Sequence, residues 1–209
     1  MPKTWVRERK RDYYYRKAKE EEYRSRAAYK LLQAVKKYHF IGEGDVVIDL
    51  GAAPGGWLQV SQKIVGKKGL ILGVDSKTTK PLKASNVRVI VGDITNPKTE
   101  RQIALNLPFL ANTLISDVSP NISGVWEVDH ARQIDLAQQS LSLALKFLNK
   151  NGNFFVKVFQ GDMFQSFVDR VKQHFSRVEI IKPKASRAKS AEIFILGMGF
   201  QGLPDLSSC

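Results

Sequence analysis

The chain has 209 residues, 43% of them hydrophobic and 25% charged, which is the composition of a folded protein with a hydrophobic core. Its single cysteine, Cys209, excludes a disulfide framework, and its three histidines (His39, His130 and His174) lack the spacing of zinc ligands, so we expect no metal. No apolar run approaches the roughly 20 residues of a membrane span, and the charged N-terminus lacks the apolar stretch of a secretion signal. We therefore expect a cytoplasmic protein that does not enter a membrane.

Basic residues outnumber acidic ones by 33 to 20, which gives a net charge of +13 and points to a polyanionic partner. More than half of this excess lies in the first 40 residues of the chain. Aromatic residues that can stack on bases interleave with these charges, namely Trp5, Tyr13, Tyr14, Tyr15 and Tyr23. A second basic cluster, KPKASRAKS, occupies residues 182–190. We expect both segments to bind nucleic acid, although a solvated terminal tail would also explain the first.

The first predicted element is a helix that has Ser25 as its N-cap, carries apolar residues at helical spacing from Ala27 to Tyr38, and ends near Gly42. Five short apolar runs then indicate buried strands, at residues 46–50, 69–75, 87–93, 113–118 and 153–159. Helices are predicted among and after them, from about Trp57 to Val65, at 98–107, from about Val128 to Asn149 and at 162–175. This alternation predicts an α/β fold with a doubly wound, Rossmann-like and mostly parallel sheet.

The C-terminal part differs, because residues 176–183 and 190–200 are strand-like runs with only a loop between them. They predict an antiparallel pair at the edge of the sheet. We expect a basic N-terminal extension over residues 1–24, one domain over 25–203 and a tail over 204–209. A monomer is the expected state.

Acidic residues stand at the ends of the predicted parallel strands. Four of the strands end in or next to an aspartate, in chain order Asp49, Asp75, Asp93 and Asp117. In an open α/β sheet, ligands bind outside the carboxyl ends of the strands, where the strand order reverses. Each aspartate alone is explained as a helix cap or a turn residue, but four together favour a ligand site.

The loop GAAPGG (51–56) follows the first strand, and Gly51, Gly55 and Gly56 let its backbone bend sharply and approach a ligand. It lacks the G-x-G-x-x-G of dinucleotide enzymes and the Lys-Ser/Thr of a P-loop, which argues against a pyrophosphate ligand and a dinucleotide oxidoreductase. Asp75 stands where an acidic residue bonds ribose hydroxyls, and Asp93 is placed for an adenine amine. Because carboxylates also suit a cationic sulfonium, the predicted cofactor is S-adenosylmethionine.

Seven strings, in the same order along the chain, resemble the FtsJ-like ribosomal RNA 2′-O-methyltransferases: SRAAYKL (25–31), DLGAAPGGW (49–57), VDSK (74–77), GDIT (92–95), SDVSPNISG (116–124), KVFQG (157–161) and SRAKSAEIF (186–194). They span most of the chain, and their combination is specific, whereas the glycine motif alone would indicate only a methyltransferase. The resemblance implies methylation of a ribose 2′-hydroxyl, typically of a uridine in large-subunit ribosomal RNA, with S-adenosylmethionine as the methyl donor.

The resemblance also implies a catalytic set, which corresponds here to Lys30, Asp117, Lys157 and Glu192. By the same matching, the residues that resemble the family's cofactor contacts are Gly55, Trp57, Asp75, Asp93 and Asp117. Structural explanations also exist for several of these residues. Lys30 is explained as an exposed helix lysine and Asp117 as a turn cap. Glu192 is explained as a charge that protects an edge strand from aggregation, and Trp57 as helix packing.

Lys157 places a charge within the apolar run NFFVKVF, which requires a reason. In-line methyl transfer needs a hydroxyl that is positioned and loses its proton. Lys157 is therefore predicted either to deprotonate this hydroxyl or to orient it as a cation. Lys30 and a sulfonium would favour release of the lysine proton, whereas Asp117 and Glu192 would oppose it, so both roles stay open.

Two other functions remain open at this point. The same chemistry on a tRNA or an mRNA cap is the nearer alternative, and the basic N-terminal segment favours ribosomal RNA without deciding the question. A non-catalytic RNA-binding protein of ribosome assembly is the more distant one, because its candidate site would be expected to have degenerated. The chain departs from the recognisable pattern at Asp162, Met163 and Phe164 and in its last residues, GLPDLSSC.

Overall fold

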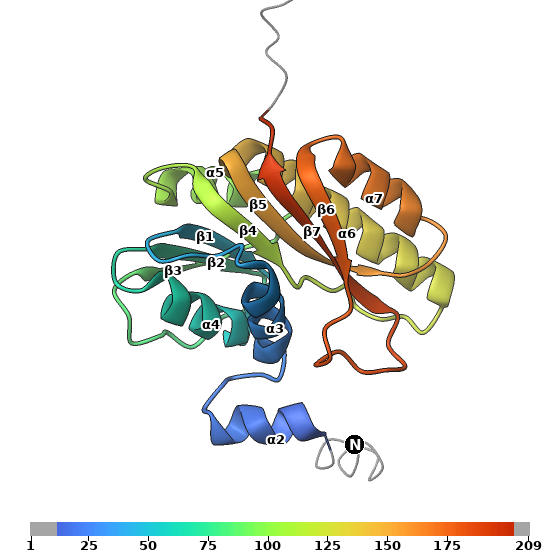
Figure 1. Ribbon diagram of the computed structural model, residues 1–209, viewed down its shortest axis with the longest axis horizontal. Helices are drawn as coiled ribbons and strands as arrows, with labels where there is room; N and C mark the ends of the chain where they lie inside the picture. The colour runs from blue at the N-terminus through green and yellow to red at the C-terminus, as the bar shows by residue number, and fades with distance from the viewer. Residues whose placement is uncertain (1–11, 203–209) are drawn as a thin grey trace, which may run out of the picture.

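The computed structural model describes residues 12–202, which form a seven-stranded sheet between two layers of helices (Figure 1). The strand order is β3-β2-β1-β4-β5-β7-β6. The strands are β1 (Val46–Leu50), β2 (Leu70–Asp75), β3 (Val87–Val91), β4 (Ala111–Ser116), β5 (Leu148–Phe159), β6 (Phe175–Ile181) and β7 (Glu192–Phe200). The first five run parallel to one another, and β7 is antiparallel to both of its neighbours.

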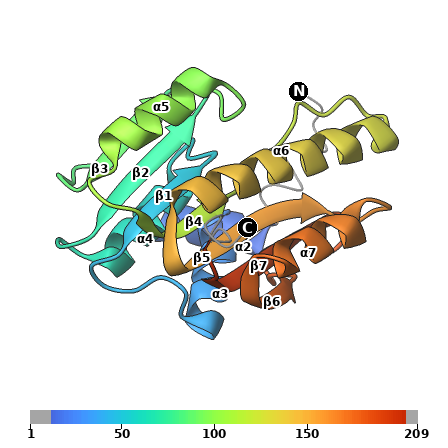
Figure 2. The same cartoon turned by 90° about the horizontal axis from the view of Figure 1, so that it is seen from above.

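The helices are α2 (Tyr13–Glu20), α3 (Ala28–Tyr38), α4 (Gly56–Val65), α5 (Pro97–Asn106), α6 (Trp126–Phe147) and α7 (Phe164–Lys172). Figure 2 shows α5, α6 and α7 on one face of the sheet, with α3 and α4 on the other. Each face has its own hydrophobic cluster, and adjacent residues of a strand project to opposite faces. Phe154 accordingly packs in the cluster with α6 and α7, whereas Phe155 packs in the cluster with α3 and α4.

The predicted doubly wound sheet is confirmed, with corrections at the ends of elements. β4 ends at Ser116, so Asp117 follows the strand, and β5 begins at Leu148 rather than near residue 153. The helix predicted from Ser25 begins only at Ala28 and has no side-chain cap, so the prediction of Ser25 as its N-cap is wrong. The hydroxyl of Ser25 instead lies against Gly56, where a Cβ atom would be 2.3 Å from it.

The predicted antiparallel pair at the edge of the sheet is confirmed. The last strand, β7, lies between β5 and β6, and β6 is the outermost strand. This arrangement sets Lys157 of β5 opposite Phe194 of β7, and Phe159 opposite Glu192. The start of β7 therefore lies beside the carboxyl end of β5, where the family resemblance places two of its catalytic residues.

The N-terminal helix α2 packs on the domain through a small apolar cluster. Ala18 of α2, Tyr29 of α3 and Ala185 of the loop between β6 and β7 are buried together. The division into an extension, a domain and a tail stays a prediction, and residues 1–11 and 203–209, which include Trp5, Cys209 and the tail, lie outside the described residues. Within residues 12–202, no helix is both long enough and apolar enough to cross a membrane.

Candidate active site

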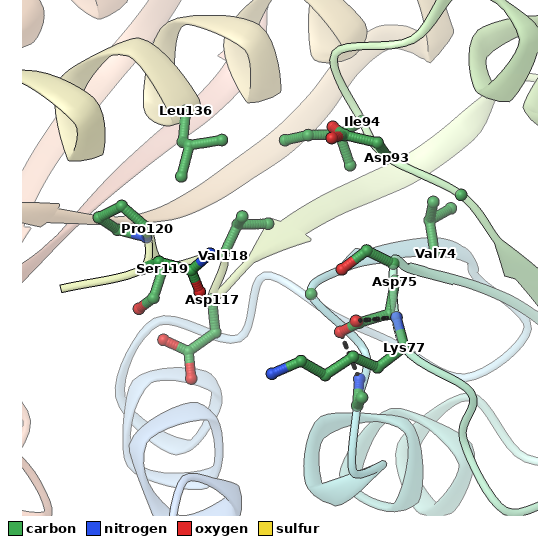
Figure 3. A pocket seen from close by; sticks show the side chains of 15 residues that line it. Val74, Asp75, Lys77, Asp93, Ile94, Asp117, Val118, Ser119, Pro120 and Leu136 are labelled. Atoms are coloured by element: carbon green, nitrogen blue, oxygen red, sulfur yellow. Dashed lines mark hydrogen bonds between the residues drawn. The ribbon is translucent and has the colours of Figure 1, made fainter.

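A cavity of about 410 Å³ lies at the carboxyl ends of β1 to β4 (Figure 3). The chain order reverses here, because β1 pairs with β2 on one side and with β4 on the other. Such a switch point is where open α/β sheets bind their ligands. Four residues predicted to bind the cofactor line the cavity, namely Gly51, Asp75, Asp93 and Asp117. In Figure 3, Asp117 lies across the cavity from Asp75 and Asp93.

Gly51 makes the turn that opens the cavity after β1. Its φ is +79°, and a Cβ atom there would lie 2.9 Å from the backbone nitrogen of Val118. A side chain at this position is thus excluded both by backbone conformation and by the close approach of the segment that follows β4. The absence of a side chain keeps the two strand ends together along one wall of the cavity.

Asp75 and Asp93 are held in place by backbone groups. Asp75 accepts hydrogen bonds from the amides of Ala53 and Lys77 at 2.9 and 2.8 Å, which ties the glycine-rich loop to the end of β2. Asp93 accepts from the amide and the hydroxyl of Thr95 at 2.9 and 2.8 Å. Both carboxylates therefore present fixed acceptor oxygens at the acidic rim of the cavity.

Three other predicted cofactor contacts, Gly55, Gly56 and Trp57, are absent from the lining of this cavity. They begin α4, and a Cβ atom on Gly55 or Gly56 would meet the side chain of Arg24 or Ser25. Trp57 is 3% exposed, stacks on Phe155 with 5.6 Å between ring centroids, and donates from Nε1 to the carbonyl of Ala27 at 2.8 Å. These contacts give the three residues packing roles, in which they join α4 to the segment before α3.

Asp49 is buried beneath this region, on β1. It is 0% exposed, and neither carboxyl oxygen has a hydrogen-bond partner among the described residues. Burial raises the pKa of Asp49 well above its usual range, and the negative charges of Asp117 and Asp75 raise it further. The surroundings of the carboxyl group thus favour its neutral form.

Lys157 and Asp117 form an ion pair beside the cavity. Lys157 is 4% exposed, and its Nζ lies 3.1 Å from Oδ1 of Asp117. The same ammonium donates to the carbonyl of Asp117 at 2.9 Å and to the hydroxyl of Ser119. Burial alone would raise the pKa of Asp117, but the charges of Lys157 and Lys30 outweigh burial and hold that pKa below its usual range.

The second pair of predicted catalytic residues is Lys30 of α3 and Glu192 of β7. Their charged atoms are 2.6 Å apart, and Ser186 donates to the other oxygen of Glu192 at 2.8 Å. The Lys30 ammonium lies 5.7 Å from the ring centroid of Phe194, which is opposite Lys157 in the sheet. The fold therefore brings together four charged side chains that are far apart in the sequence.

Residues that the sequence did not single out hold this cluster in place. Gln133 of α6 donates to the carbonyls of Lys157 and Val118 at 3.0 and 3.3 Å, and Ser119 accepts from the Lys157 ammonium. Gln133 is 1% exposed, so it is a polar side chain on the apolar face of a helix. That pattern is the one sequence signal that would have found it, because buried polar groups need partners.

The switch-point cavity, the acidic rim and the buried lysine define the class of protein as an α/β enzyme of the methyltransferase type. Comparison with known proteins agrees: the FtsJ-like methyltransferase family matches residues 23–200, and the chain belongs to that family. The resemblance drawn from the sequence is thereby confirmed. In the part of the chain that the structure describes, no group of three or more potential ligand side chains is arranged to hold a metal ion.

Individual relatives share both sequence and fold. The chain is 50% identical over 200 residues to ribosomal RNA large subunit methyltransferase E of Methanococcus aeolicus, covering 96% of this chain and 74% of that protein. The protein of the same name in Methanothermobacter thermautotrophicus is 45% identical over 202 residues, which cover 97% of this chain and 96% of that protein. A Plasmodium falciparum crystal structure named as a ribosomal RNA methyltransferase superimposes with a TM-score of 0.77 at 27% identity, covering 87% of this chain and 100% of that one.

Proposed function

We propose that this protein transfers a methyl group from S-adenosylmethionine to the 2′-hydroxyl of a uridine ribose in large-subunit ribosomal RNA. The observation that carries the proposal is the buried Lys157–Asp117 pair at the edge of the switch-point cavity. The names of the relatives described above support the choice of RNA, since those proteins are named as ribosomal RNA large subunit methyltransferases.

The cavity fits S-adenosylmethionine on several grounds. Asp75 and Asp93 would hold ribose hydroxyls and an adenine amine, and Gly51 lets the segment after β4 close against the end of β1 along one wall of the cavity. The negative charges of Asp75 and Asp117 act on the same region, since both raise the pKa of Asp49, and a positively charged ligand in the cavity would be attracted to them. When bound, this cofactor supplies an electrophilic methyl carbon on a cationic sulfur.

The hydrogen bonds of Lys157 favour the cationic role over the role of base. Its Nζ donates to the carbonyl of Asp117 and to the hydroxyl of Ser119, and a carboxylate oxygen of Asp117 lies 3.1 Å away as its ion-pair partner. A carboxylate at this distance attracts an ammonium but not a neutral amine, and two hydrogen bonds leave the third N–H free for the substrate. We infer that Lys157 acts as a cation that orients the lone pair of the ribose 2′-oxygen towards the methyl carbon.

The proton of the ribose hydroxyl then leaves late. Bound S-adenosylmethionine would supply the methyl group and retain the sulfur electron pair as the 2′-oxygen takes the methyl carbon, and the hydroxyl proton would pass to water or to Asp117. Because the pKa of Asp117 is below its usual range, this carboxylate is a weak base. It accepts the proton only once the new carbon–oxygen bond has made the hydroxyl strongly acidic.

Basic residues continue from this site along α3 and are a candidate path for the RNA backbone. A cavity of about 240 Å³ is lined by Arg26, Lys30, Arg187 and Glu192, among others. A third hollow lies farther along α3 and contains four lysines, Lys36, Lys37, Lys182 and Lys184. The loop between β6 and β7 carries the basic cluster at 182–190, and α2 packs beside it through Ala18 and Ala185. The described part of the basic N-terminal segment therefore adjoins the same surface as this cluster. We propose that a monomer binds the RNA there.

The test is transfer of labelled methyl from S-adenosylmethionine to large ribosomal subunits, naked large-subunit RNA and tRNA, followed by mapping of the modified nucleotide. The proposal expects label on a ribose 2′-oxygen of a uridine in large-subunit RNA. Label on tRNA or on an mRNA cap alone would keep the chemistry and overturn the substrate. Binding of the cofactor without transfer to any RNA would overturn the enzymatic assignment.

A further inference from the structure

Exposed apolar side chains gather at the end of the sheet where the proposed reaction takes place. They belong to the segment before and at the start of α6 and to the loop after β5, and they are Ile122, Val125, Trp126, Val128 and Met163, from 39% to 65% exposed. An exposed apolar group of this kind is a common mark of a binding surface. None of these residues takes part in the mechanism described above.

Trp126 is the largest of these side chains, and it is 45% exposed. Its indole stacks on the rings of two other residues. The centroid of His130 is 5.6 Å away with the planes 19° apart, and that of Phe159 is 6.1 Å away with the planes 21° apart. The indole is therefore supported by two aromatic rings while much of its own surface remains open to solvent.

The support beneath Trp126 is itself fixed. His130 is 5% exposed, and its Nε2 accepts a hydrogen bond from the amide of Met163 at 3.2 Å. Gly161 lies against the same imidazole, since a Cβ atom there would be 2.8 Å from a ring carbon. Asp129 accepts from the amides of Ser123 and Gly124 at 2.8 and 3.0 Å, which fixes the turn that leads into α6. A preorganised aromatic surface loses little entropy when a ligand stacks on it.

This surface adjoins the proposed reacting group. Phe159 follows Lys157 by two residues in β5, and α6, which begins with Trp126, binds the carbonyl of Lys157 through Gln133 at 3.0 Å. Phe159 also lies opposite Glu192 in the sheet. A ribose held at Lys157 therefore has its own base, or the base of a neighbouring nucleotide, within reach of the stacked rings.

We propose that Trp126 is a stacking platform for an unpaired base of the RNA substrate, either the target base or its immediate neighbour. This inference rests on the proposed function. Proteins that read single-stranded RNA stack its splayed bases on aromatic rings and hold the backbone with basic residues. Here the basic path begins at Lys30, which lies over Phe194, the residue opposite Lys157, while Trp126 stacks on Phe159 near the end of the same strand. The net charge of +13 favours a nucleic acid as the partner.

The experiment compares the full-length wild type with Trp126→Ala and Trp126→Phe on naked large-subunit RNA. A matched control is Phe109→Ala, because Phe109 is 77% exposed but precedes β4 at the opposite end of that strand. Methyl transfer gives kcat and KM, and fluorescence anisotropy of labelled RNA gives the affinity without turnover. Thermal melting verifies that each variant is folded.

Stacking of one base predicts that Trp126→Ala lowers kcat/KM and RNA affinity by about tenfold or more. Trp126→Phe keeps a ring and should stay within about threefold of wild type, and Phe109→Ala should be unchanged. Wild-type values for Trp126→Ala on naked RNA would overturn the proposal. A loss confined to assembled ribosomal subunits would overturn it in favour of a protein contact. If wild type methylates no RNA, the proposed function fails, while the anisotropy measurement still decides whether Trp126 binds RNA.

Discussion

Lys157 and Asp117 meet through both the side chain and the backbone of the aspartate. The Lys157 ammonium lies 3.1 Å from a carboxylate oxygen of Asp117 and donates to the carbonyl oxygen of the same residue at 2.9 Å. The lysine comes from the end of β5, and the aspartate comes directly after β4. This double contact holds the Lys157 ammonium in a buried position. Removing either residue would leave the charge of the other buried and unpaired.

The first prediction concerns the charge of Asp117. In Lys157→Met, burial of the Asp117 carboxyl is opposed only by the Lys30 cation, so the pKa of Asp117 should be higher than in the wild type. The measurement is a carbon NMR titration of the aspartate carboxyl groups in both proteins. A pKa for Asp117 that is the same in the two proteins would contradict the proposed coupling.

A second prediction concerns Asp49 and the pH dependence of stability. The pKa of Asp49 is raised in the folded state, chiefly by burial, so between the pKa values of the unfolded and folded states the folded protein retains a proton that the unfolded chain has lost. Stability is therefore reduced progressively as the pH rises above the ordinary aspartate pKa of about 3.9. Asp49→Asn removes this dependence.

The melting temperature of Asp49→Asn relative to wild type should thus increase from about pH 4 to about pH 8. Differential scanning calorimetry of both proteins across this range measures the difference. The sign of the slope is the informative quantity, since the asparagine also changes the packing at every pH. A difference that stays constant or shrinks as the pH rises would show that Asp49 is ionised in the folded protein.

The third prediction separates backbone strain from steric conflict at Gly51. Gly51 and Gly44 have similar φ values, +79° and +83°, but a Cβ atom on Gly44 would meet nothing within 4 Å. Both Gly→Ala variants should lose about 1 kcal/mol of stability because of the left-handed backbone. Only Gly51→Ala should also displace the segment at Val118 and weaken S-adenosylmethionine binding, by about tenfold or more. Calorimetric titration with the cofactor measures this; equal affinities of the two variants would contradict it.

Much of the sheet is predictable from the sequence because its central strands are buried on both faces and read as apolar runs. Val46–Leu50 was predicted without error for that reason. The start of β5 was missed, because residues 149–152 are polar or glycine and contain a positive φ at Asn151. Neither property is typical of a strand. Residues 149–152 lie between two paired positions, Leu148 with Ala111 and Asn153 with Thr113, where the register shifts, so their place in the sheet depends on tertiary contacts.

In the candidate site, too, features set by the local sequence could be predicted, whereas contacts between distant segments could not. The positions of Asp75 and Asp93 were predictable, because aspartates at the ends of parallel strands share one edge of the sheet. The pairing of Lys30 with Glu192 joins residues 162 positions apart, and only the family resemblance pointed to it. Trp57 was grouped with the cofactor contacts through the family resemblance, with helix packing as the structural alternative, and the start of α4 directs its ring into the core.

The most direct test of the central claim is the rate of methyl transfer by Lys157→Met on large-subunit RNA, measured together with its affinity for S-adenosylmethionine. The affinity is measured as well because Lys157→Met also removes the ion-pair partner of Asp117, which lines the cofactor cavity. The rate constant kcat should fall by about 10² to 10⁴, because the ribose oxygen loses the cation that orients it. Transfer at close to the wild-type rate, with the variant folded and the cofactor bound, would contradict the account.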